Sequence, residues 1–327
     1  MQEKDFRGYC LERRLDKEAV DKAVAAVREF EEHLNENGKI LESAAVGDVK
    51  EYVSLLISQN RNSADRLLAL ARYTGMMKRN DVYIYFASLL GARNVLPTIS
   101  DRVAAMAGEE MRRKIFDGVR MPPLGSSPDK YPPVTRRLVG RLESELNPEM
   151  CRKVLSGNNH RVPRENFKKD REKFLKARTI DEFLKDLHER AVANLEKLMG
   201  EGRLFGEQEI TPQVIEHVKA NQEILAGVRR GDKIYFTKIP YAPREYLNET
   251  DPKMKRYYAC HCPLARESIL HDEPRISPTW CYCSGGFVKL RYDVIFDEET
   301  EVEVLENVLD GDLRCHFAIR IPEGKFK

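Results

Sequence analysis

Residues 232–241 read DKIYFTKIPY, and this stretch decides the fold class because the chain changes there from helical to strand-like sequence. Apolar and polar residues alternate, and β-branched and aromatic residues dominate, which is typical of a half-buried strand. Three later stretches also have the character of strands: GGFVKLRYDVIF at 285–296, EVEVLENVL at 301–309 and CHFAIRIP at 315–322. Strands gathered behind a set of helices predict an α+β fold with an antiparallel sheet.

The chain before residue 228 is predicted to be helical. Residues 17–38 carry one apolar stripe, and further helices are expected at 48–59, with Asp48 as its cap, at 62–75 and at 81–92. Short helices with short links predict a bundle. Helices return at 147–157, with Gly157 as its C-cap, at 179–202, and from Thr211, whose cap position is followed by Pro212.

Three regions follow from this pattern. Residues 1–95 form the helical module. Residues 96–145 are expected to be a connector, because MPPLGSSPDKYPPVT at 121–135 is rich in Pro, Gly and Ser and indicates a loop. Residues 146–327 form an α+β domain that carries most of the cysteines.

Composition sets broad limits on the class of protein. The 327 residues are 42% hydrophobic and 33% charged with a net charge of +2, which favours a globular protein without a strong global field. The polar start MQEKDFRGYC is unlike a secretory signal, and no apolar run reaches the roughly 18 residues of a membrane span. We therefore expect a cytoplasmic protein, where clustered cysteines are metal ligands or reactive thiols more often than disulfides.

Four of the seven cysteines form two C-x-C pairs, Cys260 with Cys262 and Cys281 with Cys283. Thiolates two residues apart on an extended chain project to the same side, so each pair could grip one ion. Together they predict a four-thiolate zinc site, with an iron–sulfur cluster as the alternative cofactor. His261 and His316 are optional nitrogen ligands, and a closed structural zinc or an unmetallated set of thiols stays open.

The residues around the cysteines suggest a pocket for a small anion. Arginine, lysine and tyrosine side chains near thiolates could bind such a molecule, and the substrate-binding candidates are Lys238, Tyr241, Arg256 and Arg266. Ser284, Gly285 and Gly286 would allow a ligand to approach the backbone closely. The candidates for proton transfer are Glu267 and His160, the latter in the turn-like sequence GNNHRVP at 157–163.

The helical module resembles the SAM-like core-binding domain of tyrosine recombinases, through its run of short helices and the sequence LLALARY. The resemblance implies a module that contacts DNA. Residues 1–95 contain 15 Lys and Arg against 15 Asp and Glu, a balance that argues against a DNA clamp. A packing or dimerisation module is the other interpretation, which would allow a homo-oligomer.

The end of the chain resembles two small-molecule families. Gly311, Asp312, Cys315 and Phe317 are similar to the close of vinyl-reductase-type domains and of the L-2-amino-thiazoline-4-carboxylic acid hydrolase-like family. The longer stretch from GNNHRVP through RYYACHCPLARESI to WCYCSGGF resembles an uncharacterised bacterial family of cysteine-bearing domains. The hydrolase-like resemblance implies water addition to a small sulfur-containing ring.

This sequence departs from the zinc-binding members of the vinyl-reductase-type group. Where those proteins have a cysteine and a glutamate before the final cysteine, this chain has Asn307 and Val304. Their zinc site therefore does not transfer, and the C-x-C pairs would supply another.

Three functions follow as expectations. The first is a metal-binding protein with a small-molecule pocket, possessing hydrolase-like activity on a small anionic or sulfur-containing substrate. The second is a ligand- or redox-sensing regulator whose N-terminal module contacts DNA or a protein partner. The third is a scaffold whose zinc is structural.

Overall fold

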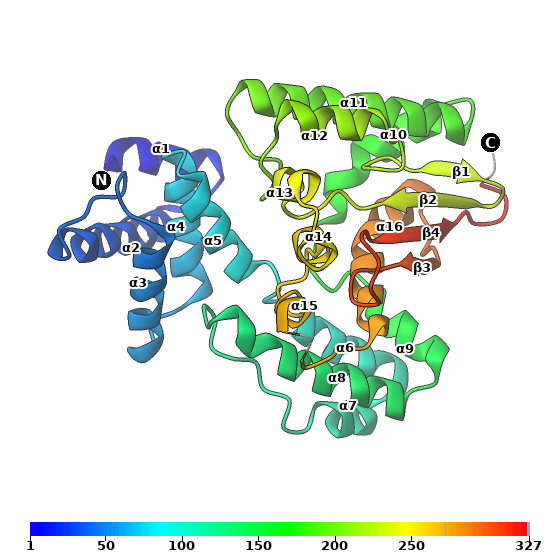
Figure 1. The fold of residues 1–327 in the computed structure, drawn as a ribbon, viewed down its shortest axis with the longest axis horizontal. Helices are drawn as coiled ribbons and strands as arrows, with labels where there is room; N and C mark the ends of the chain where they lie inside the picture. The colour runs from blue at the N-terminus through cyan, green and yellow to red at the C-terminus, as the bar shows by residue number, and fades with distance from the viewer. Residues whose placement is uncertain (272, 326–327) are drawn as a thin grey trace. The chain divides into compact units, whose positions relative to one another are not determined.

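The computed structural model describes residues 1–271 and 273–325, and the chain forms two compact units in it. The first unit comprises Met1–Arg93 and Met121–Ser127, and the second comprises Asn94–Arg120 and Pro128–Lys327. Helices dominate both units, and a four-stranded antiparallel sheet lies in the second (Figure 1). The prediction of an α+β fold is therefore confirmed.

The first unit is built from five helices. They are α1 (Glu3–Glu12), α2 (Lys17–Glu36), α3 (Val46–Ser58), α4 (Ala64–Met76) and α5 (Asn80–Leu90). Their apolar stripes meet in one core, where the ring of Phe30 contacts the ring of Phe86 edge-on at 6.0 Å. Residues 121–127 lie on this core through Leu124, whose carbonyl accepts a 2.7 Å bond from Asn62 Nδ2. Asp48 is not the cap of α3, because it lies in the first turn and accepts the N–H of Ala45.

The second unit opens with helices in the region that was expected to be a connector. These are α6 (Val95–Ala107), α7 (Glu109–Phe116), the 3₁₀ turn η1 (Pro128–Lys130) and α8 (Tyr131–Glu145). The loop predicted from MPPLGSSPDKYPPVT holds only up to residue 127. Pro132 and Pro133 lie in the first turn of α8, where the missing N–H groups cost nothing, so proline content misled the prediction.

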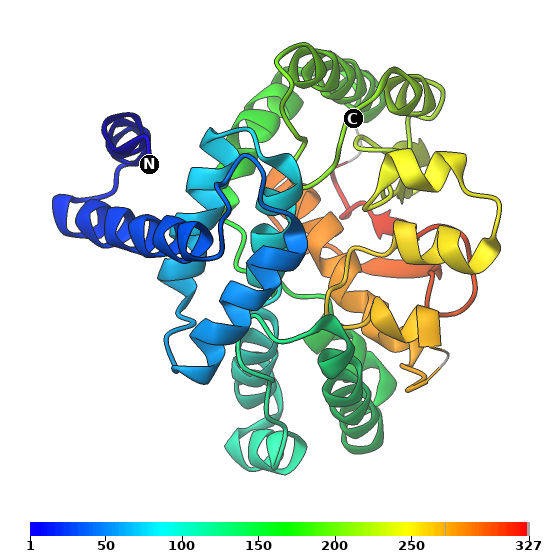
Figure 2. The same cartoon turned by 60° about the vertical axis from the view of Figure 1, so that its left-hand side comes forward.

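Five helical segments lead from there to the sheet, and a sixth follows its first two strands. They are α9 (Pro148–Leu155), η2 (Arg164–Phe167), α10 (Lys168–Lys176), α11 (Ile180–Gly200), α12 (Pro212–Lys219) and, after two strands, α13 (Pro243–Asn248). Ser156, not Gly157, caps the end of α9. Thr211 caps α12 through its hydroxyl and Pro212 opens that helix, as predicted. Helices α11 and α12 pack side by side (Figures 1 and 2).

The sheet has the order β1-β2-β4-β3. Its strands are β1 (Val228–Arg230), β2 (Lys233–Thr237), β3 (Val302–Glu306) and β4 (His316–Arg320), and all neighbours are antiparallel. The central register pairs Lys233 with Arg320 and Thr237 with His316. The last helices are α14 (Pro252–Ala259), α15 (Glu267–His271), η3 (Pro278–Cys281) and α16 (Tyr282–Phe296).

Helix α16 corrects one prediction, because residues 285–296 were expected to be a strand. This helix is buried on nearly all sides and contacts both β3 and β4, so it shows no 3.6-residue alternation of apolar and polar positions. Its valine, isoleucine and aromatic residues also favour strands intrinsically. A short buried helix with such a composition cannot be distinguished from a buried strand by periodicity.

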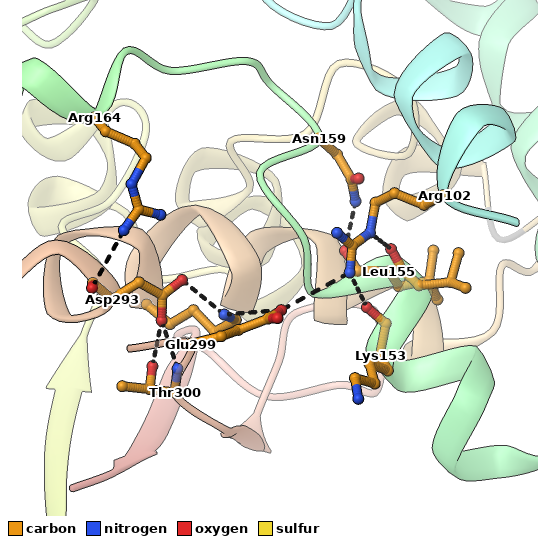
Figure 3. A network of polar contacts seen from close by, with 10 residues as sticks. Arg102, Lys153, Leu155, Asn159, Arg164, Asp293, Glu299 and Thr300 are labelled. Atoms are coloured by element: carbon orange, nitrogen blue, oxygen red, sulfur yellow. Dashed lines mark hydrogen bonds and ion pairs between the residues drawn. The ribbon is translucent and has the colours of Figure 1, made fainter. Parts of the chain in front are cut away.

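A buried polar network fixes α16 in place (Figure 3). Lys289 and Asp293 are almost fully buried and form an ion pair of 2.7 Å, while the backbone N–H and hydroxyl of Thr300 donate to the other carboxylate oxygen of Asp293. Glu299 lies 3.7 Å from Lys289 and 3.9 Å from Arg102, which in turn donates to the carbonyls at the end of α9. The network thereby links α6, α9 and α16.

Candidate functional site

Lys238 and Cys315 become neighbours because of the sheet register. Thr237 and His316 are paired, so the residue that follows β2 and the residue that precedes β4 meet at one end of the sheet. The N–H of Lys238 donates to the carbonyl of Cys315 at 3.0 Å. A cysteine far along the chain is thus placed beside Lys238.

The first C-x-C pair lies against the segment that leaves β2. Cys260 caps the end of α14, and the N–H of Ala242 donates to the carbonyl of Tyr258 at 2.9 Å. His261 Nε2 lies 2.6 Å from the carbonyl oxygen of Ile239, so this nitrogen carries the proton. These bonds hold residues 258–262 alongside residues 239–242.

The second C-x-C pair lies at the start of α16, not on an extended chain as expected. Cys281 ends η3 and Cys283 stands in the first turn of α16. Trp280 Nε1 donates to the sulfur of Cys262 at 3.3 Å, and Lys238 Nζ donates to Ser284 Oγ at 3.0 Å. Both bonds bring the second pair toward the first pair and toward Lys238.

Two adjacent glycines allow α16 to begin in this position. A Cβ on Gly285 would meet Val302 and Phe317 of the sheet at 3.2–3.5 Å, whereas one on Gly286 would lie 2.5 Å from the backbone of Ser156 and Gly157. The sequence suggested that these glycines admit a ligand. In the structure the close approach is made by other parts of the chain.

The loop GNNHRVP contacts the second pair. Asn158 bonds both the N–H and the carbonyl of Val162, which makes the loop a side-chain-stabilised turn as expected. Asn159 is fully buried, and its Nδ2 bonds the carbonyl of Leu155 (Figure 3) and lies 3.9 Å from the sulfur of Cys283. His160 Nε2 lies 3.8 Å from the same sulfur, and its ring packs edge-on against Phe287.

The five cysteines of this region act on one another electrostatically, and we call Cys260, Cys262, Cys281, Cys283 and Cys315 the thiol cluster. Burial raises the pKa of every thiol in it, for Cys260 and Cys283 to about 12. Burial lowers the pKa of Lys238, while four of the cluster thiols act in the opposite direction. Burial and the nearby cations Lys238 and Arg266 hold the pKa of His261 well below its usual value.

Arg266 lies between two aromatic rings. Its guanidinium carbon is 4.3 Å from the ring centroid of Tyr241 and 5.2 Å from that of Tyr257. The hydroxyl of Tyr241 donates to Glu207 at 2.7 Å and the hydroxyl of Tyr257 donates to Glu267 at 2.9 Å. Nε of Arg266 is buried without a hydrogen-bond partner in the described part of the chain.

The structure gives several of the predicted site residues defined partners. Lys238 lies with the thiol cluster, His160 contacts Cys283, and Tyr241 stacks on Arg266. Arg256 is directed elsewhere, since its Nε donates to the carbonyl of Val308 at 2.8 Å. Each ring nitrogen of His316 faces a carboxylate, Glu223 at 3.1 Å and Glu306 at 3.4 Å.

Three residues of this region were not among the predicted site residues. Cys315 was named for the family resemblance at the end of the chain and not as a metal ligand, and its place in the cluster depends on the register of β2 and β4. Glu207 and Asn159 reach the site from loops before α12 and after α9. Glu207 carries no local sequence signal. Asn159 lies in the turn-like sequence GNNHRVP, but its contact with Cys283 depends on helix packing.

Metal-site geometry is not preformed. Within residues 1–271 and 273–325, no three His, Cys, Asp or Glu side chains already lie in an arrangement that could hold a metal ion. The donors of the thiol cluster are sulfur atoms, the type that thiophilic ions prefer.

Comparison with known proteins identifies one family. Residues 211–326, about a third of the chain, match the model of a family of unknown function (DUF6144). No curated protein and no solved structure matches the chain. The matched stretch includes the thiol cluster, Lys238 and Arg266, and it excludes His160 and Glu207. None of the helices in the described residues has the length and hydropathy of a membrane span.

Proposed function

We propose that the thiol cluster binds a thiophilic metal ion, zinc in the first place, beside a site for a small molecule. The observation that carries the proposal is the environment of Lys238. In the described part of the chain its ammonium bonds the neutral hydroxyl of Ser284, and no carboxylate lies within 4.0 Å of it. The titratable groups that act on this ammonium are thiols of the cluster.

A buried ammonium without a counter-charge costs several kcal/mol. Protonated thiols do not offset that cost, because they are neutral. Thiolates do, and a divalent ion with four thiolate ligands carries a net negative charge. Metal binding would therefore stabilise both the thiolates and the ammonium of Lys238. In the metal-free chain, burial instead raises the pKa of the thiols and lowers that of Lys238.

The ligand type favours zinc, with an iron–sulfur cluster as the alternative cofactor. Since the described side chains do not form the site in advance, the thiols have to turn toward a common point when the ion binds. Five thiols exceed the four of a closed tetrahedral zinc site, so one thiol remains for exchange or for a ligand.

Partial exposure of this region is the basis for proposing a small-molecule site here. Cys262, Lys238, Ser284 and His160 each keep some solvent-accessible surface. A zinc ion with an open position can activate water, which is the chemistry that hydrolase-like action on a small sulfur-containing molecule requires. His160, at 3.8 Å from the sulfur of Cys283, is the residue that we propose for proton transfer.

Anaerobic purification followed by elemental analysis and an absorption spectrum tests the metal proposal. We expect about one zinc per chain and no colour. The double substitution Cys260→Ser with Cys281→Ser leaves three cluster thiols and should release the ion. The matched control is Cys10→Ser with Cys151→Ser, since both are buried thiols outside the cluster; it should keep the full metal content.

Equal metal content in the two double variants would overturn the assignment of the cluster as the metal site. Absence of metal from the wild-type protein, together with failure to take up added zinc, would overturn metal binding itself. Iron with sulfide and a broad visible band would select the iron–sulfur alternative.

A further inference from the structure

Arg266 has a guanidinium that contacts two aromatic rings but forms no ion pair in the described part of the chain. In the described residues no carboxylate lies within 4.0 Å of its nitrogens, and its buried Nε has no partner. The residue as a whole keeps accessible surface. The unpartnered Nε of Arg266 needs an explanation, because a buried N–H group without a hydrogen-bond partner destabilises the folded state.

The two nearby carboxylates accept hydrogen bonds from tyrosine hydroxyls and form no ion pair with this guanidinium. Glu207 accepts from the hydroxyl of Tyr241 and Glu267 from the hydroxyl of Tyr257. Each tyrosine therefore places its ring against Arg266 and its hydroxyl on a carboxylate. Rings on the guanidinium hold it by cation–π attraction and leave its N–H edges as the directions for hydrogen bonds.

Two cations of this region, Arg266 and Lys238, could attract an anion. Lys238 is a second cation in this region, and His261 is held neutral by burial and by these two cations. Cys260 also senses the charge of Arg266, so the guanidinium lies close to the thiol cluster. An exogenous oxyanion at Arg266 would therefore lie beside the proposed metal ion.

From this geometry we infer that Arg266 is the recognition residue for a small oxyanion, bound by charge-assisted hydrogen bonds to the guanidinium. Tyr241 and Tyr257 position it, and Glu207 and Glu267 hold the tyrosines. The inference deepens the proposed function, because it names the class of molecule that the site takes. It also reassigns Glu267, which the sequence suggested for proton transfer, as a positioning residue.

Titration calorimetry on the full chain tests this inference, with sodium phosphate and sodium acetate as probes and sodium chloride at the same ionic strength as the reference. The wild-type protein should bind at least one of the two oxyanions. Tighter binding of phosphate would indicate a phosphate ligand, and tighter binding of acetate would indicate a carboxylate ligand. Arg266→Gln should weaken binding about tenfold or more. Arg275→Gln is the control, because Arg275 is exposed in the same region, and it should leave binding unchanged.

Two further variants test whether the shape of the guanidinium matters as well as its charge, and whether weaker binding reflects more than a loss of folding. Arg266→Lys keeps the charge but loses the planar fork, so it should recover only part of the affinity. Tyr257→Leu removes one ring while Arg266 stays, and it should weaken binding severalfold even if Arg266→Gln fails to fold. Full affinity in Arg266→Lys or in Tyr257→Leu would overturn the inference, as would wild-type protein that binds neither probe.

Metal content measured on the same samples separates the two proposals. Oxyanion binding that depends on Arg266 in protein that takes up no metal would sink the metal proposal and leave this inference standing. Metal uptake without any oxyanion binding would do the reverse.

Discussion

Gly286 in α16 faces the backbone of Gly157, and a Cβ on Gly286 would lie 2.5 Å from the Gly157 carbonyl oxygen. Two backbones therefore meet where the loop that carries His160 packs on the helix that carries Cys283. Because backbone on both sides cannot yield as a flexible side chain would, the contact fixes the position of that loop.

Gly286→Ala should consequently lower the free energy of unfolding by about 2–3 kcal/mol, through overpacking. Chemical denaturation with urea would measure the change. Gly140→Ala is the matched control in the same unit, since Gly140 is exposed in α8 with no atom within 4 Å of an added Cβ. It should stabilise the protein by about 0.5–1 kcal/mol, and equal effects of the two substitutions would contradict the packing argument.

The buried ion pair in α16 predicts a large effect of removing one charge. Asp293→Asn retains an oxygen for Thr300 but leaves the ammonium of Lys289 with only the largely exposed carboxylate of Glu299, at 3.7 Å, as its counter-charge. The free energy of unfolding should therefore fall by about 3 kcal/mol. Adding Lys289→Met to this variant should restore part of the loss, which a double-mutant cycle would quantify.

An exposed pair supplies the comparison. Glu165→Gln removes the partner of Lys168, and both side chains are about two-thirds exposed. Its effect on the free energy of unfolding should stay within about 0.5 kcal/mol. A loss in Asp293→Asn no larger than this would show that the pair is not effectively buried.

Lys238 predicts a pH dependence of stability in the metal-free protein. Its folded pKa lies below the unfolded value of 10.5, so between the two values the unfolded chain binds a proton that the folded chain has released. The free energy of unfolding should therefore rise with pH in that window, by up to about 1.4 kcal/mol per pH unit. Lys238→Met should remove this rise.

The measurement is the difference between wild type and Lys238→Met in urea denaturation across the alkaline range. Titrating groups that Lys238 does not influence are common to both proteins and cancel in the difference. Parallel pH profiles would contradict a lowered pKa for Lys238.

The affinity for zinc should also depend on pH, because the ligand thiols must lose their protons when the ion binds. Burial raises the pKa of the cluster thiols, for Cys260 and Cys283 to about 12, so the metal-free thiols carry their protons near neutral pH. Binding must release these protons, and the apparent affinity should rise about tenfold or more per pH unit. Competition with a chromophoric chelator at several pH values measures this, and a pH-independent affinity would argue against thiolate ligands.

The sequence predicted the parts of the fold that carry a clear local signal. Alternation in residues 232–241, the stripe in α2 and the cap at Thr211 all correspond to elements in the structure. The failures have physical causes. Helix α16 is buried on nearly all sides and rich in strand-favouring residues, and Pro132 and Pro133 start a helix instead of extending a loop.

In the candidate site, too, only the features with a local sequence signal were predicted. The two C-x-C pairs were visible as local motifs, but the position of Cys315 depends on a strand register, and that of Glu207 depends on a tyrosine far along the chain. Single-sequence patterns do not report such long-range pairings. The chemistry of Arg266 likewise became apparent only when both of its tyrosine neighbours were placed.

The cluster cysteines stand at the ends of elements. Cys260 follows the last turn of α14, Cys281 precedes the first turn of α16, and Cys315 precedes β4. Element ends are where backbone hydrogen bonds open first. An ion shared by these thiols would act as a cross-link between three ends that otherwise fray independently, so its removal should accelerate amide hydrogen exchange at all three together.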